Sequence, residues 1–139
     1  MKLSQKSSLK YVHSGLLILR VGVGIVFMMH GIPKLLGGPE LWAKYGQAMS
    51  HIGIDFFPAF WGFMAAFAEA VGGLLILLGL AFLPATLILS FTMLIAFWMH
   101  FSTDADFVKY SHPLKSLIVF ISLAVTGPGK YRLSKFIVK

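Results

Sequence analysis

The sequence predicts an all-α membrane protein, a four-helix transmembrane bundle with a short amphipathic interfacial helix between helices 1 and 2. Hydrophobic residues make up 58% of the 139 residues, charged residues only 12%, and mean hydropathy is +0.83. A soluble domain carries about 25% charged residues, so too few charges remain to cover a water-exposed surface. The apolar residues also gather in four runs. The length suits a single domain covering residues 1–139.

The four apolar runs are the predicted membrane spans: 15–36, 56–80, 83–101 and 108–126. A helix needs about 20 residues to cross the ~30 Å hydrocarbon layer, and the first three runs satisfy this. The fourth reaches that length only if its helix begins near Phe107, with Lys109 and Lys115 extending their charges outward.

The connection 37–55 follows the glycine pair that ends the first run. Pro39 suits a first helical turn, and large apolar residues recur after it at helical spacing. We therefore expect a short amphipathic helix on the membrane surface. The alternative is a plain exposed loop, which would leave five large apolar side chains in water. These side chains are Leu41, Trp42, Tyr45, Met49 and Ile52.

Charge placement predicts the orientation. The side of a membrane protein richer in Lys and Arg stays in the cytoplasm. The net charge of +7 is spread over the chain ends and connections instead of forming one patch, so no nucleic-acid partner is expected. Cysteine is absent, which excludes thiolate and disulfide chemistry. We predict a multi-pass protein of the bacterial cytoplasmic (inner) membrane, with both termini cytoplasmic. Cations without acidic neighbours flank the two termini: Lys2, Lys6, Lys10, Lys130, Arg132, Lys135 and Lys139.

Ionisable side chains inside the spans are the candidate functional residues, because each costs about 2.5–3.5 kcal/mol or more at a helix centre. Arg20 and Glu69 are expected on helix faces rich in small residues, where another helix packs. They form either a register-fixing ion pair or a ligand contact. Lys34 is expected as an interfacial anchor. His30 and His100 are interfacial or hydrogen-bonded residues, or axial ligands of a haem. No metal site is expected, because paired carboxylates and His-x3-His are missing.

Two motifs stand in the apolar runs: Leu19-Arg20-x3-Gly24-x5-His30-Gly31-x2-Lys34 in the first run, and Glu69-x2-Gly72-Gly73 in the second. They resemble motifs of the DoxX family of small bacterial membrane proteins. The resemblance continues through the closing Gly127-Pro128-Gly129 and covers nearly the whole chain. It implies a four-helix membrane bundle, and it assigns Arg20, His30, Lys34 and Glu69 to the family's polar positions.

The resemblance also implies a function, since relatives are named for subunits of quinone-linked oxidoreductases. We expect a quinone-interacting accessory subunit of a membrane redox complex, not an enzyme on its own. Its ligand would lie among Arg20, His30, Lys34, Glu69 and His100, and its partners would be the lipid bilayer, a redox partner subunit and a second copy. The alternative is a small non-redox membrane protein for proton-coupled transport or membrane organisation. A haem-binding bundle is the minor option.

Overall fold

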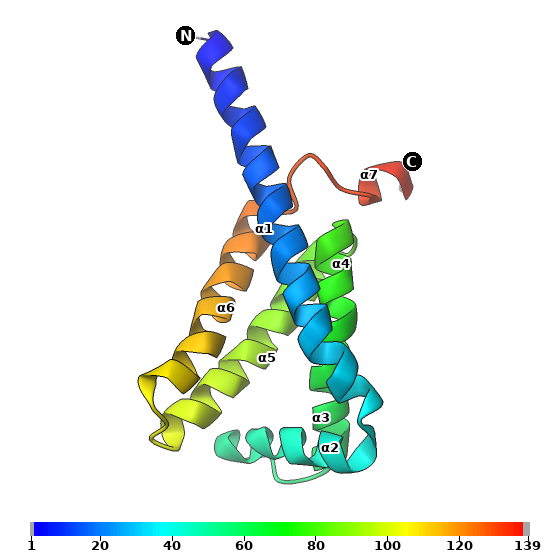
Figure 1. The fold of residues 1–139 in the computed structure, drawn as a ribbon, viewed down its shortest axis with the longest axis vertical. Helices are drawn as coiled ribbons and strands as arrows, with labels where there is room; N and C mark the ends of the chain where they lie inside the picture. The colour runs from blue at the N-terminus through cyan, green and yellow to red at the C-terminus, as the bar shows by residue number, and fades with distance from the viewer. Residues whose placement is uncertain (1, 138–139) are drawn as a thin grey trace.

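The computed structural model describes residues 2–137, with side chains from residue 8 to residue 136, and helices are the only regular secondary structure in this part of the chain (Figure 1). Its helices, joined by short non-helical connections, are α1 (Lys2–Leu36), α2 (Gly38–Gly46), the 3-10 helix η1 (Gln47–Ile52), α3 (Pro58–Phe67), the π-helix η2 (Ala68–Gly72), α4 (Gly73–Leu78), α5 (Phe82–Ser102), α6 (Phe107–Thr126) and α7 (Ser134–Ile137).

Three of the described helical stretches are long and apolar enough to cross a membrane: Ser8–Leu36, Pro58–Leu78 and Phe82–Ser102. The second consists of α3, η2 and α4 in one continuous rod. The predicted runs 56–80 and 83–101 agree with these helices to within two residues. α1 begins at Lys2, well before residue 15, because the polar residues that precede the predicted span are also helical. Large apolar side chains on all three stretches are exposed, as a lipid-facing surface requires.

α1 packs closely along the α3–η2–α4 rod because glycines remove the side chains between the two backbones. A Cβ atom on Gly24 would lie 2.7 Å from the carbonyl oxygen of Gly73. A Cβ atom on Gly31 would overlap the backbone of Ala70 and lie 2.7 Å from the carbonyl carbon of Glu69. Small residues that bring helices together are the usual basis of helix association in lipid.

α5 and α6 form an antiparallel pair that meets α1 and α4 in an apolar core near the two termini (Figure 1). The rings of Phe27 on α1 and Phe120 on α6 meet edge to face, with centroids 4.7 Å apart. Ile76, Leu89 and Leu123 are fully buried in the same core. The helix pairs spread apart toward the other end of the molecule, where α2 and η1 lie across the space between α3 and α5 (Figure 1).

The connection between the first two spans is helical in α2 and η1, so the plain loop considered for it is excluded. α2 is pressed against α3 at two glycines. A Cβ atom on Gly46 would overlap the carbonyl of Pro58, and one on Gly62 would overlap the carbonyl of Trp42. η1 is tied to α5 as well, since Trp98 Nε1 donates to the carbonyl oxygen of His51 at 3.2 Å.

Candidate functional site

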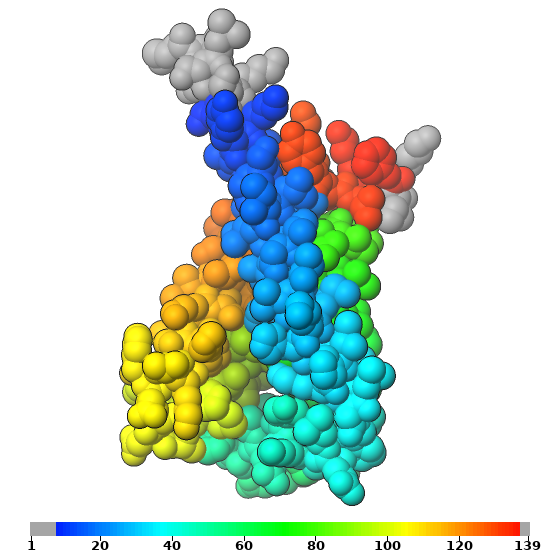
Figure 2. All heavy atoms as spheres, in the orientation of Figure 1, coloured from blue at the N-terminus to red at the C-terminus, as the bar shows by residue number. Residues whose placement is uncertain are grey.

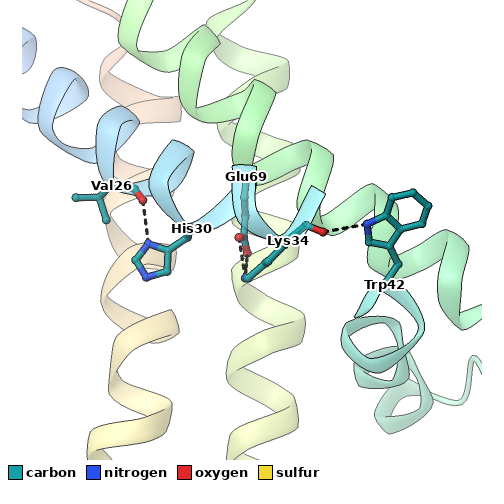
Figure 3. A network of polar contacts seen from close by, with 5 residues as sticks. All are labelled: Val26, His30, Lys34, Trp42 and Glu69. Carbon is teal, nitrogen blue, oxygen red and sulfur yellow. Dashed lines mark hydrogen bonds and ion pairs between the residues drawn. The ribbon is translucent and has the colours of Figure 1, made fainter. Parts of the chain in front are cut away.

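Lys34 and Glu69 form a bidentate ion pair between α1 and η2, the only salt bridge found among the residues whose side chains are described (Figure 3). Lys34 Nζ lies 2.9 Å from Glu69 Oε1 and 2.7 Å from Oε2. The Glu69 side chain is 6% exposed and that of Lys34 24% exposed. Glu69 lies near the middle of the Pro58–Leu78 stretch, whereas Lys34 lies in the last turn of α1.

A π-helical turn carries Glu69. η2 inserts an extra residue into the turn between α3 and α4, and such insertions are frequent at functional sites. Glu69, Ala68 and Ala70 are all buried there. Gly31 lets α1 lie directly on this turn, and Lys34, three residues later, follows on the same side of α1. The close approach at Gly31 therefore positions the lysine against the carboxylate.

Aromatic side chains from α2 surround the end of α1 at Lys34. Trp42 Nε1 donates to the carbonyl oxygen of Lys34 at 3.0 Å, and this oxygen in the last turn of α1 also accepts from the backbone N–H of Gly37 at 3.2 Å (Figure 3). Lys34 Nζ also lies 4.9 Å from the ring centre of Tyr45, within cation–π range. The ammonium group is thus held by a carboxylate on one side and a ring face on the other.

A cavity of about 690 Å³ opens beside the ion pair, between α3, α5 and the α2–η1 segment. Ligand pockets in proteins are mostly apolar, measure about 300–1,000 Å³ and contain a few polar groups. Here the lining is mostly apolar, and Lys34 and Glu69 are among its few polar groups. The other lining residues include Tyr45, Met49, Phe60, Trp61, Met64, Ala65, Ile88, Phe91, Ile95 and Met99.

The ion pair expected between Arg20 and Glu69 is not formed. The carboxylate of Glu69 is taken by Lys34, so Lys34 is not a simple interfacial anchor. Arg20 Nη1 instead donates to the carbonyl oxygen of Pro128 at 2.9 Å. The physical reason is the stagger of the two helices. Glycine contacts place Gly31 at Glu69, and Arg20 is 11 residues away from Gly31 on α1, about 16 Å along the helix axis.

His30 and His100 do not line the cavity, so the structure does not bring the predicted polar residues into one site. His30 is exposed, and its Nδ1 lies 2.9 Å from the carbonyl oxygen of Val26 on the same helix (Figure 3). Because Gly31 faces η2, the preceding residue points about 100° away around α1. Within the described residues, no group of three or more His, Cys, Asp or Glu side chains could hold a metal ion.

The contribution of α2, η1 and α5 to the cavity was not predicted from the sequence. The partner of Glu69 was not predicted either, although the sequence contains a signal for it. Arg20, Phe27 and Lys34 repeat every seven residues and therefore share one face of α1. Either cation could have met Glu69, and only the stagger of α1 against η2 selects Lys34.

Known proteins resemble this chain in sequence. A family model described as DoxX matches residues 15–101. The "Inner membrane protein YqjF" of Escherichia coli (strain K12) is 34% identical over 131 residues, covering 90% of this chain and 93% of that protein. The "Putative oxidoreductase CatD" of Bacillus subtilis (strain 168) is 30% identical over 128 residues, covering 90% and 88%. No solved structure matches significantly. The chain belongs to the DoxX family and is a protein of the bacterial inner membrane.

Proposed function

We propose that this protein binds a quinone, or a similar amphipathic ring compound, in the cavity beside Lys34 and Glu69. It would serve there as an accessory subunit of a membrane redox complex. The observation that carries the proposal is a mostly apolar cavity of about 690 Å³ with a buried ion pair on its wall. Ionisable residues at membrane depth are costly and mark ligand or proton sites.

The residues of the cavity suit such a ligand chemically. Lys34 Nζ is a donor that can reach a ring carbonyl oxygen, and Glu69 is an ionisable group that can exchange a proton when a quinone is reduced. The rings of Tyr45 and Trp61 offer flat apolar surfaces for the head group. These groups bind, orient and exchange protons, and electrons would come from a partner subunit.

The mouth of the cavity suits a ligand that arrives from the bilayer. Four of the lining residues, two on α3 and two on α5, are exposed at their apolar side chains. In a membrane these side chains face lipid, so a hydrocarbon tail can pass between α3 and α5 without entering water. The four residues are Phe60, Met64, Ile88 and Phe91. The name of the Bacillus subtilis relative, "Putative oxidoreductase CatD", supports the redox hypothesis over transport.

A cavity-filling variant tests the proposal. Ala65 lines the cavity, and Ala65→Phe fills it while leaving the ion pair in place. Leu74→Phe is the matched control, because Leu74 is exposed on the same rod and does not line the cavity. We expect quinone to co-purify with the wild-type protein and Leu74→Phe in mild detergent, measured by solvent extraction and mass spectrometry, and to be lost from Ala65→Phe. Equal quinone content in all three proteins, or none in the wild type, would contradict the proposal.

We further propose that α6 is a fourth span and that α2 and η1 lie at the outer membrane surface. α6 has 20 residues, about 30 Å of helix, and packs along the whole length of α5. The described parts of both termini lie at the same end of the molecule, as an even number of spans requires (Figure 1). Cations concentrate at that end, which supports a cytoplasmic location for both termini.

A further inference from the structure

Arg20 is a buried cation that has no acidic partner among the residues whose side chains are described. It is only 3% exposed, and its Nε has no hydrogen-bond partner within the same residues. The acceptor that the described part of the chain gives it is the carbonyl oxygen of Pro128, 2.9 Å from Nη1. A guanidinium group carries five N–H donors and stays ionised. A buried charge that is not paired is strongly unfavourable, so we expect Arg20 to have a further hydrogen-bond acceptor.

The protein itself has few carboxylates to offer. The chain contains five Asp and Glu side chains. Glu69 is paired with Lys34, and the other four lie on α2 or in the connections at the opposite ends of the helices: Glu40, Asp55, Asp104 and Asp106. The surroundings of Arg20 are instead cationic. A Cβ atom on Gly79 would lie 2.6 Å from Arg20 Nη1 and 2.8 Å from the Cβ atom of Arg132, so both arginines border the same glycine.

The position of Arg20 along the bundle indicates where the acceptor comes from. α4 ends at Leu78, directly before Gly79, α5 begins at Phe82, and α6 ends at Thr126. Arg20 therefore lies at the level where three other helices end, although α1 itself continues beyond them toward the N-terminus (Figures 1 and 2). Helices of about 20 residues match the ~30 Å hydrocarbon layer, so their ends lie near the phosphate groups of the lipids.

We infer that this corner of the molecule, formed by Arg20, Gly79 and the loop from Gly127 to Arg132, binds an anionic phosphate group. Arg20 is the principal ligand, because a guanidinium binds phosphate through parallel charge-assisted hydrogen bonds. His13 lies two helical turns away on the same face of α1, and its buried Nδ1 also has no partner among the described residues. The phosphate belongs either to a phospholipid head group or to a free anion.

The experiment uses the full chain, washed free of lipid in mild detergent, and follows its thermal midpoint. One arm adds inorganic phosphate against chloride of equal ionic strength. The other arm adds phosphatidylglycerol against phosphatidylcholine in mixed micelles. We expect phosphatidylglycerol to raise the midpoint of the wild type, and Arg20→Gln to bind it with roughly tenfold or weaker affinity. The matched control is Lys10→Gln, which removes one exposed positive charge from the same helix and should retain wild-type affinity.

Each outcome decides the inference. A shift with the lipid alone identifies a head-group site, and a shift with inorganic phosphate as well identifies a site for free anions. If neither probe shifts the wild-type midpoint, or if Lys10→Gln loses as much affinity as Arg20→Gln, the inference is overturned. If Arg20→Gln does not fold, Arg20→Lys replaces it. Arg20→Lys keeps the positive charge and loses the planar guanidinium group. Its affinity for phosphatidylglycerol should therefore be weaker than that of Lys10→Gln without being abolished.

Discussion

At the scale of single residues, the structure separates two cations that look alike in the sequence. Lys34 and Arg20 lie on one face of α1, and both are largely shielded from solvent: Arg20 is 3% exposed and the Lys34 side chain 24% exposed. Lys34 has a carboxylate partner, which neutralises it, and a cavity beside it. Arg20 has only a backbone carbonyl. On this difference we assign Lys34 to the proposed ligand site and Arg20 to the inferred phosphate site.

A double-mutant cycle distinguishes these roles. Lys34→Met leaves the buried Glu69 carboxylate without its partner and should destabilise the protein by about 3–5 kcal/mol, whereas Glu69→Gln leaves only the partly exposed Lys34 and should cost less. The double variant removes both charges and should recover most of that loss. Thermal midpoints in detergent measure the effect. The companion cycle of Arg20→Gln with Glu69→Gln should be additive, because the two residues share no contact. A coupling as large as that of Lys34 with Glu69 would refute the assignment of the pair.

At the scale of elements, contacts between helix backbones decide where side chains meet. Gly31 brings α1 onto the π-turn η2, and this contact sets the height at which Lys34 meets Glu69. Gly46 and Gly62 do the same for α2 and α3, and they hold α2 and η1 over the cavity. The π-turn has its own effect, because an extra residue changes which side chains face α1 before and after it.

Gly31→Ala tests the first of these contacts. Its new Cβ atom would overlap backbone atoms of Ala70, which cannot rotate away, so α1 must shift from η2. Overpacking of this kind costs about 1–3 kcal/mol, and we expect a lower thermal midpoint and weaker quinone retention. Gly22→Ala is the control, because no atom lies within 4 Å of its added Cβ and alanine favours helix. An equal loss of stability in both variants would show that the close approach does not matter.

Gly46→Ala tests the docking of α2. The added methyl group would overlap the carbonyl of Pro58, so α2 should detach locally from α3 and uncover the cavity. Amide hydrogen exchange should then accelerate in α2 and η1 while the amides of α5 and α6 keep their protection. Gly15→Ala provides the control, since its Cβ would meet nothing within 4 Å. Unchanged exchange in α2 would mean that this segment is held by other contacts.

At the scale of the whole molecule, the bundle is well packed at one end and hollow at the other. The end near the termini contains the apolar core around Phe120 and Ile76, and it also holds Arg20 beneath the loop at Pro128. The opposite end contains the cavity beneath α2 and η1. This division places the proposed ligand site and the inferred phosphate site at different levels of the membrane, so each can be tested without altering the other.

Cysteine labelling tests the proposed arrangement in the membrane. Because the sequence contains no cysteine, each introduced cysteine is the only one that can be labelled. Single cysteines replace Glu40 on α2, Asp106 before α6 and Lys130 after α6, all of them exposed. In spheroplasts, we expect a membrane-impermeant maleimide to label Glu40→Cys and Asp106→Cys, and to label Lys130→Cys only after the membrane is opened. Labelling of Asp106→Cys and Lys130→Cys from the same side would exclude a fourth span.

Local sequence patterns alone determined where the helices of this protein form. Long apolar runs predicted the helices, because a chain in lipid must satisfy its backbone hydrogen bonds within each segment. The runs also indicated Arg20, His30, Glu69 and His100 as the costly residues within them, with Lys34 expected only as an interfacial anchor. The partners of those residues were decided only by tertiary structure. Residues on one helical face are equivalent in sequence, and the stagger of α1, fixed by the glycine contacts and the π-turn, assigned Lys34 to Glu69 and Arg20 to Pro128. The cavity likewise exists only because segments distant in sequence enclose it.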